Sequence, residues 1–276
     1  TNWNWNLGVG TPISNSTNAN VSASYPSSII YNPTLQVKTS TGCLSPVYSL
    51  PVTVHPNPLP DFTMSYACLP DGVVNFSNTS TIADGSQASF AYRWFFGDPA
   101  TGVLDTAYIQ NPSHKYSATG PYSIKLKITS GDGCIDSVTK SQTAIYPQPK
   151  ADFNAPVEVC DRAVASFTDA SNGITHPLAK WEWRFINSAG ITVGSSANKD
   201  TVFRFPVAGT YTVRHWVFTN QGCVSDTIEK QIIINPLPTP LNSLSTPLCE
   251  KNQITISDNS MPNAGTLVRW HWNLGD

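Results

Sequence analysis

The chain has 276 residues, a formal net charge of −2, 12% charged residues and 11% aromatic residues. Because a domain of roughly 100–150 residues is typical, this length predicts two or three domains with cores of their own. Long exposed helices need more Glu, Lys and Arg than this chain has, and a disordered tether would have fewer aromatic residues. The near-neutral charge excludes an electrostatic footprint for nucleic acid or for an anionic membrane. The composition therefore predicts a soluble, β-rich protein of several domains.

No apolar run approaches the roughly 18 residues that a membrane-spanning helix needs, so we expect no membrane insertion. Residue 1 is Thr, with no basic-then-apolar leader after it, so any targeting signal is expected to lie outside these residues. Six cysteines in a chain so poor in charge, none of them in a C-x-x-C pair, favour structural disulfides in an oxidising, extracellular setting over zinc or thioredoxin-type sites. The six are Cys43, Cys68, Cys134, Cys160, Cys223 and Cys249.

A tryptophan motif recurs along the chain at intervals of 89 residues, at Trp5, Trp94, Trp183 and Trp272. Proline-rich segments recur at the same phase, and alternating prolines cannot join a sheet ladder, so we interpret them as short stiff linkers. The intervals divide the chain into four repeats. These are residues 1–58, which lack an opening hairpin; 59–147 and 148–236, which are complete; and 237–276, which hold only opening strands.

The elements of a complete repeat follow in a fixed order. Phe62 and Phe76 flank turn residues and mark an opening hairpin, and an equivalent pair of phenylalanines does so in the next repeat. After the tryptophan strand, apolar and polar residues alternate at 122–129 and at 211–217, which is the period of a half-buried strand. A Gly-Cys turn and a β-branched run then complete a closing hairpin. Roughly seven strands per repeat predict an all-β fold of tandem immunoglobulin-like sandwiches, arranged end to end as a rod.

Three of these segments carry a family resemblance. Residues 92–98, 111–116 and 120–124 resemble the Y-x-W-x-F-G-D, N-P-x-H-x-Y and G-x-Y-x-V signatures of PKD (polycystic kidney disease) domains. The added Gly-Cys-x-Asp elements resemble the variant that is repeated in secreted surface proteins and gliding-motility adhesins of Bacteroidota. The resemblance implies PKD-type sandwiches on a bacterial cell surface, contacting neighbouring repeats and exported by type IX secretion. The motif loses its Gly-Asp after Phe185, so we expect no catalytic role for it.

The aromatic residues of the repeats have different expected roles. The central tryptophans are expected in the cores, because sandwiches of this type bury a tryptophan on the third strand. Trp216 and Phe218 instead lie on the face of their strand opposite Val213 and Val217. Two interpretations stay open for this pair: an outward platform that stacks on sugar rings, or a packing contact beneath a neighbouring loop.

The polar motif residues favour structural roles. Asp98 is expected to accept backbone N–H bonds in the turn after the tryptophan strand, since calcium would need more clustered carboxylates. His215 takes an inward strand position, and the resemblance implies a packed, hydrogen-bonded ring for His114, so neither is expected to bind metal or act as a base. With no catalytic motif and four glutamates, we expect no enzyme activity, cofactor or metal.

Two cysteine pairings stay open. One lies within repeats, as Cys68–Cys134 and Cys160–Cys223, and leaves Cys43 and Cys249 for partners outside the chain. The other joins Cys68 to Cys223 between successive repeats. The turns of the first and last hairpins of a sandwich lie about 20–30 Å apart, whereas a disulfide needs Cα atoms within about 7 Å, which speaks against the first pairing.

Four Asp-Ser/Thr-apolar triplets resemble the O-glycosylation acceptor of Bacteroidota. The resemblance implies glycans on some of Thr106, Ser137, Thr201 and Thr227. Ser137 and Thr227 occupy equivalent strand positions, where a hydroxyl or β-branched side chain is expected in any case.

The function predicted is a non-catalytic spacer and adhesive filament, with surface polysaccharide or other cell-envelope proteins as further partners. The alternative is a carbohydrate-binding accessory region of a secreted polysaccharide hydrolase, and a protease appendage is a third. Residues 1–58 and 237–276 alone would expose Trp5 and Trp272, at a cost of about a few kcal/mol each. We therefore expect either a longer tandem protein or half-domains completed by another chain.

Overall fold

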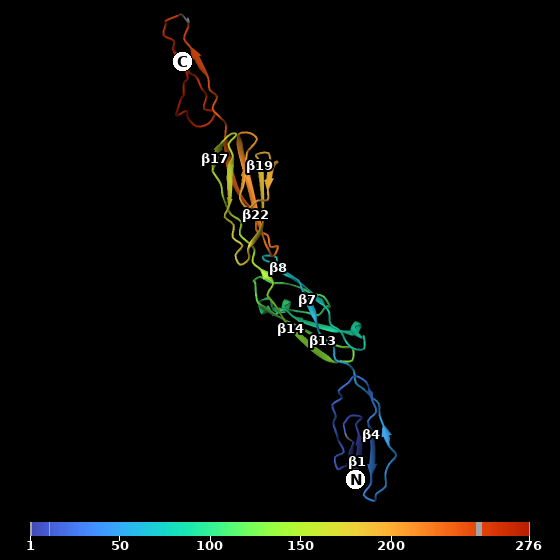
Figure 1. Ribbon diagram of the computed structural model, residues 1–276. Coiled ribbons are helices and arrows are strands. Elements are labelled where there is room, and N and C mark those ends of the chain that lie inside the picture. The colour runs from blue at the N-terminus through green and yellow to red at the C-terminus, as the bar shows by residue number, and fades with distance from the viewer. Residues whose placement is uncertain (1, 11, 247–249, 276) are drawn as a thin grey trace. The chain divides into compact units, whose positions relative to one another are not determined.

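The computed structural model describes residues 2–10, 12–246 and 250–275. In these residues the regular structure is almost entirely β-strand, with short 3-10 segments at η1 (Gln87–Ser89) and η2 (Pro99–Asp105). No helix in the described ranges is long and apolar enough to cross a membrane. The chain divides into two compact units, Thr1–Ala67 with Gly72–Ile145 and Cys68–Asp71 with Tyr146–Asp276. Figure 1 shows the strands of each part.

The N-terminal part of the first unit is built around the strand that carries Trp5. In the larger sheet, with order β2-β1-β4-β5, the strands are β1 (Asn2–Asn6), β2 (Ile13–Ser16), β4 (Thr34–Lys38) and β5 (Tyr48–Ser49). A separate pair joins β3 (Ile30–Tyr31) to β6 (Val52–Thr53). Trp5 lies opposite Leu35 on β4, so these two side chains share one face of the sheet.

The 59–147 repeat is a two-layered sandwich. One sheet has the order β11-β10-β13-β14, made of β10 (Ala91–Phe95), β11 (Thr106–Ala107), β13 (Tyr122–Thr129) and β14 (Ile135–Gln142). The other has the order β12-β9-β7, made of β7 (Phe62–Met64), β9 (Val73–Asn78) and β12 (Ser113–Lys115). A short pair of strands, β8 (Ala67–Cys68) and β15 (Ile145–Tyr146), completes it. The opening and closing hairpins expected from the sequence are both present.

The 148–236 repeat has the same plan with longer strands. Its smaller sheet has the order β16-β18-β21, made of β16 (Phe153–Asn154), β18 (Ala165–Asp169) and β21 (Thr201–Phe203). Its larger sheet has the order β17-β23-β22-β19-β20, made of β17 (Glu158–Cys160), β19 (Leu178–Asn187), β20 (Thr192–Ser196), β22 (Gly209–Thr219) and β23 (Ile228–Asn235). Strand β17 pairs with β23 in parallel, so the start of the repeat crosses from one sheet to the other.

The cores form around the repeated tryptophan. Trp94 and Trp183 are both 0% exposed, which confirms their expected burial. The indole N–H of Trp94 donates to the Ile109 carbonyl at 3.0 Å, and that of Trp183 to the Asn198 carbonyl at 2.8 Å. Each ring is therefore held by apolar packing and by one satisfied hydrogen bond.

The Gly97 turn explains the glycine of the motif in the first complete sandwich. Gly97 has a φ of +70°, and a Cβ placed there would lie 2.5 Å from the Ser123 carbonyl oxygen. Any other residue would meet both a left-handed backbone and a backbone clash. The 148–236 repeat has Ile186 in the corresponding stretch and extends β19 to Asn187 instead.

The C-terminal segment differs from the expectation in one respect. Strands β24 (Asn242–Leu244) and β25 (Ile256–Asp258) pair as the opening hairpin of a further repeat. The residues around Trp272 form no strand, although the sequence motif predicts one there. A strand exists only where a neighbour satisfies its N–H and C=O groups, and in the described part of this segment no later strand lies beside it. Trp272 is accordingly 43% exposed.

Candidate functional site

The outer face of strand β22 presents an aromatic pair. Val213, His215 and Val217 point into the 148–236 core, each at most 1% exposed. Trp216 and Phe218 alternate with them and are only half-buried, on the opposite face. The outward orientation expected from the strand period is therefore present.

Cationic side chains of the neighbouring strand cover both rings. Lys180 lies opposite Phe218 and Glu182 opposite Trp216 in the β19–β22 ladder. The Arg184 guanidinium carbon is 5.1 Å from the centre of the Trp216 ring, and Lys180 Nζ is 5.0 Å from the centre of the Phe218 ring. Side chains of an adjacent strand therefore contact both rings, and the choice between the two interpretations of this pair stays open. Cation–π contacts at such exposed positions are worth about 0.5–1 kcal/mol each.

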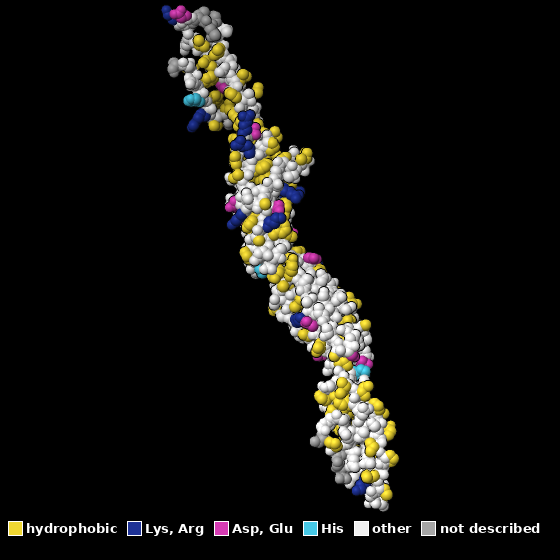
Figure 2. All heavy atoms as spheres, turned by 45° about the vertical axis from the view of Figure 1, so that its right-hand side comes forward, with side chains coloured by type: hydrophobic (Ala, Val, Ile, Leu, Met, Phe, Trp, Pro, Cys, Tyr) yellow, Lys and Arg dark blue, Asp and Glu magenta, His cyan; other side chains and the backbone are white. Residues whose placement is uncertain are grey.

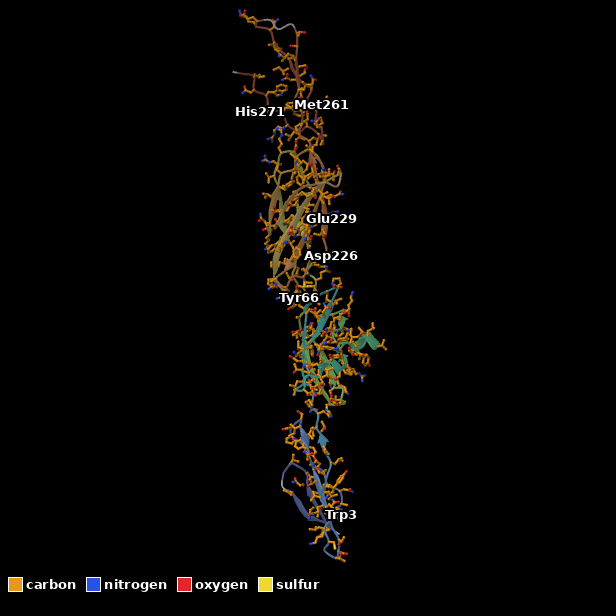
Figure 3. The ribbon with its side chains drawn as sticks, turned by 90° about the vertical axis from the view of Figure 1, so that its right-hand side faces the viewer. Trp3, Tyr66, Asp226, Glu229, Met261 and His271 are labelled. Carbon is orange, nitrogen blue, oxygen red and sulfur yellow. A yellow bond between two sulfur atoms is a disulfide. The ribbon has the colours of Figure 1, made fainter. Side chains whose placement is uncertain are left out.

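The same face continues as a row of paired charges. Lys180 Nζ is 2.7 Å from Glu182 Oε1, and Arg214 Nε is 2.6 Å from Glu229 Oε1. Glu229 lies on β23, the next strand of this sheet (Figure 3). On the face of the molecule in Figure 2, charged side chains are few and are scattered among hydrophobic side chains and the white atoms of the backbone and other side chains. The β19–β22–β23 face therefore combines flat rings with hydrogen-bonding groups in a chain otherwise poor in charge.

This cationic cover could have been foreseen in part. Lys180, Glu182 and Arg184 alternate with Trp181, Trp183 and Phe185, so the sequence places them on the outer face of their strand. The alternation does not reveal the register of β19 against β22, which is irregular between Leu178 and Lys180. That register decides which cation meets which ring.

The structure contains the between-repeat cystine. Cys68 and Cys223 form a disulfide with their Cα atoms 5.4 Å apart, across 155 residues of sequence. The alternative partners, Cys134 and Cys160, are free thiols, and so is Cys43. The within-repeat pairings are therefore not formed, because the two cysteines of one sandwich lie on elements at its opposite ends. Cys249 lies outside the described residues.

The histidines of the motifs are core residues. His114 is 6% exposed, stacks on Phe96 with ring centres 4.4 Å apart, and places Nε2 3.4 Å from Asp98 Oδ2. The backbone N–H partners expected for the Asp98 carboxylate are not found in the η2 turn, where its side chain makes no cap hydrogen bond. This carboxylate is buried, and the histidine ring across the sandwich is the partner that satisfies it.

A second buried cluster surrounds His215. The ring is 0% exposed, stacks on Trp183 with centres 3.7 Å apart, and lies between a backbone carbonyl and a carboxylate. Nδ1 is 3.0 Å from the Glu182 carbonyl oxygen, so it carries a proton, and Nε2 is 3.1 Å from Asp169 Oδ1. Asp169 also accepts the indole N–H of Trp181 at 2.9 Å. The cluster ties β18, β19 and β22 together.

Low pH is expected to destabilise the cluster around His215 and Asp169. Burial raises the pKa of Asp169, but hydrogen bonds from Ser171, Trp181 and His215 outweigh burial and hold the pKa below its ordinary value of 3.8. The folded state therefore gains stability from the ionised carboxylate above pH 3.8 and loses it as the pH falls through the lowered pKa. We expect the stability difference between wild type and Asp169→Asn to shrink between pH 5 and pH 2, in urea unfolding curves. Exposed Asp226→Asn is the control, and a difference that does not change with pH would contradict this role.

No three His, Cys, Asp or Glu side chains in the described ranges gather closely enough to hold a metal ion.

The four glycosylation candidates differ in their exposure to solvent. Ser137 and Thr227 are exposed and Thr106 is half-buried. Thr201 is buried, with 8% exposure, and lies opposite Phe167 in the β18–β21 ladder.

Comparison with known proteins supports the PKD-type fold. Residues 56–145 match the family model described as PKD domain. The chain is similar to the solved fibronectin(III)-like modules of Clostridium thermocellum CbhA, with 14% identity and a TM-score of 0.37 over 65% of this chain and 94% of that one. It is similar to the PKD1 domain of Vibrio anguillarum Epp, with 24% identity and a TM-score of 0.26 over 32% and 95%.

A tetra-tandem repeat from the extending region of a large adhesion protein is also similar, with 11% identity and a TM-score of 0.29 over 94% of this chain and 79% of that one. No curated protein sequence matches the chain. The protein is an all-β chain of immunoglobulin-like sandwiches, and its 59–147 sandwich is of the PKD type.

Proposed function

We propose that this chain is a non-catalytic repeat region of a long secreted cell-surface filament or adhesin, exported by type IX secretion and arranged end to end as a rod. The observation that carries the proposal is the Cys68–Cys223 bond, which covalently ties one repeat to the next. A bond in that place does nothing for an isolated sandwich, but it resists extension and bending where repeats meet. Tandem repeats let length scale with copy number, because each unit buries its own core.

Small-angle X-ray scattering of the 276-residue chain and of shortened versions tests the spacer role. A spacer predicts that the maximum dimension grows in proportion to the number of complete repeats, and that the oxidised chain is stiffer than Cys223→Ser. A compact particle whose size does not follow repeat number would refute it.

The carbohydrate-binding role is the second candidate, and the half-buried Trp216 and Phe218 favour it. A sugar ring could stack on Trp216 if Arg184 swung aside at a cost of about 0.5–1 kcal/mol, and the guanidinium could then bind a hydroxyl or carboxylate of the sugar.

A glycan array with the wild-type chain and Trp216→Ala tests this role. Binding weakened at least about tenfold by Trp216→Ala would establish it, since that corresponds to roughly 1.4 kcal/mol. Tyr108→Ala is the matched control, because Tyr108 also faces an arginine, with Arg93 5.9 Å from its ring centre. If the wild-type chain bound no glycan of the array, the carbohydrate-binding role would be excluded and only the spacer role would remain.

A further inference from the structure

The outer face of the β11-β10-β13-β14 sheet gathers three cationic side chains. Trp94 and Leu126 are buried beneath this sheet, so the residues that alternate with them point outward. On β13 the outward residues include Lys125 and Lys127, and on β10 Arg93 lies directly opposite Lys127. These three residues, Arg93, Lys125 and Lys127, are called the cationic face below.

The cationic face has no carboxylate to balance it. On β14 the ladder partners of the two lysines are Thr139 and Ser137, and no outward position of these four described strands is Asp or Glu. Asp136 belongs to the inward alternation of β14, and its Oδ1 accepts the Ser137 N–H at 2.7 Å. Among the described residues, no ion pair includes any of the three cations. Like charges directly opposite each other destabilise a sheet, so the face costs stability unless an anion lies on it.

The second complete sandwich shows how the same positions can be balanced. In the matching registers, Glu182 takes the place of Arg93, and Glu229 takes the place of Thr139. Glu229 Oε1 is 2.6 Å from Arg214 Nε, so the carboxylate pairs with the cation across the ladder. In the 59–147 sandwich these two carboxylates are replaced by a cation and a hydroxyl, which leaves the positive charge to a partner outside the sandwich.

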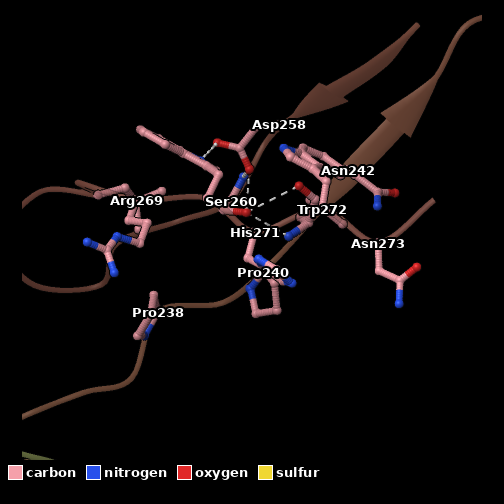
Figure 4. A pocket seen from close by; sticks show the side chains of 12 residues that line it. Pro238, Pro240, Asn242, Asp258, Ser260, Arg269, His271, Trp272 and Asn273 are labelled. Carbon is pink, nitrogen blue, oxygen red and sulfur yellow. Dashed lines mark hydrogen bonds between the residues drawn. The ribbon is translucent and has the colours of Figure 1, made fainter. Parts of the chain in front are cut away.

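The hollow beside β24 and β25 has mixed charges instead. It measures about 690 Å³, and Arg269, His271 and Asp258 are among the residues that line it (Figure 4). Asp258 accepts the indole N–H of Trp270 at 2.7 Å. A carboxylate therefore shares the wall of this hollow with a cation, whereas the cationic face offers an incoming anion no such competitor.

The spacing and donor types of the cationic face suit a row of carboxylates. Lys125 and Lys127 are two residues apart on one strand, so their Cα atoms are about 7 Å apart. The Arg93 side chain is exposed, with its guanidinium carbon 4.8 Å from the centre of the Phe95 ring. A guanidinium binds a carboxylate through two parallel hydrogen bonds, and an ammonium group binds it as a point charge. The three cations can therefore hold more than one carboxylate of the same polymer.

The surroundings of the three cations favour a sugar polymer over a protein or a nucleic acid. Ser123, Ser137 and Thr139 are exposed hydroxyl side chains of the same face, and the Phe95 ring is half-buried beside them. Hydroxyls match the hydrogen-bonding groups of sugars, whereas a stable protein interface centres on apolar anchors that fill pockets. A nucleic acid would meet a chain whose net charge is −2.

We propose that the cationic face binds an acidic polysaccharide and holds the carboxylates of its uronic acid units on Arg93, Lys125 and Lys127. The carboxylates of the polymer take the role that Glu182 and Glu229 have in the second sandwich. The site lies on a different sandwich from the aromatic pair of β22, so it depends neither on the spacer role nor on glycan binding by that pair.

Calorimetric titration with polygalacturonate tests the site, and a highly methyl-esterified polygalacturonate is the neutral polymer with the same backbone. The 276-residue chain is produced in a host that adds no glycan at Ser137, because a glycan there would lie beside Lys127. We expect binding of the acidic polymer, and loss of binding on esterification or in about 1 M salt, where the Debye length is about 3 Å. Failure to bind polygalacturonate, or equal binding of the esterified polymer or of poly-glutamate, would overturn the proposal.

Two variants of equal charge locate the site. Thr139→Glu puts a carboxylate opposite Lys125, so it should weaken polygalacturonate binding at least about tenfold, as the loss of a hydrogen bond between charged groups does. Its thermal midpoint should be no lower than that of the wild type, because Lys125 gains an ion-pair partner. Thr63→Glu, at an exposed position of β7 in the other sheet, is the matched control and should bind like the wild type. Equal weakening in the two Glu variants, or loss of binding in Trp216→Ala alone, would also overturn the proposal.

Discussion

Replacing Trp94 by alanine is expected to lower the free energy of unfolding of the 59–147 sandwich by about 3–5 kcal/mol. The ring is 0% exposed, so its removal leaves a cavity among Phe62, Phe76 and Leu126. It also leaves the Ile109 carbonyl without the indole donor that satisfies it. A loss of this size is a large part of the stability of one domain.

Urea unfolding followed by hydrogen exchange, which resolves the two sandwiches separately, measures this loss. Trp94→Phe should lose much less stability. It gives up the hydrogen bond to the Ile109 carbonyl, but it keeps most of the buried aromatic ring. Trp216→Ala should cost the 148–236 sandwich clearly less, because a half-exposed ring gives up only part of its apolar contact area together with a cation–π contact. Equal losses for Trp94→Ala and Trp216→Ala would show that the buried position has been misassigned.

Removing the Cys68–Cys223 bond is expected to cause the second largest loss of stability. Cys223→Ser should lower the free energy of unfolding by about 2–4 kcal/mol, because the bond closes a loop of 155 residues and restricts the unfolded chain. Cys68→Ser should give the same loss, and the double variant should lose no more than either single one.

Thermal unfolding under non-reducing conditions compares these variants. Cys134→Ser is the control, since Cys134 is a free thiol and its removal breaks no covalent bond. If Cys134→Ser lowered the midpoint as much as Cys223→Ser, the within-repeat pairing would have to be reconsidered.

The alternation of residues predicted the strands and their buried faces well. The period of two at 122–129 and 211–217 corresponds to β13 and β22, and the tryptophans at 89-residue spacing are the core residues of both sandwiches. Faces follow from local sequence because successive side chains of a strand point to opposite sides.

Partners between distant strands could not be predicted in the same way. The cover of Trp216 by Arg184 depends on the register of two strands, and the contact of Asp98 with His114 depends on how two sheets pack. The choice between two disulfide patterns needed the ends of the sandwiches to be located in space. A periodic pattern contains none of this information, since it fixes which side a residue faces but not which residue it meets.

The Cys68–Cys223 bond has a mechanical consequence. A pull on the chain on either side of the two cysteines crosses the covalent bond, so the residues between Cys68 and Cys223 carry no tension while the bond is intact. Strand β17 lies inside this shielded loop, whereas its parallel partner β23 lies beyond Cys223. Reduction of the bond would bring the shielded residues into the loaded path, and the extra contour length would be released only when they unfold.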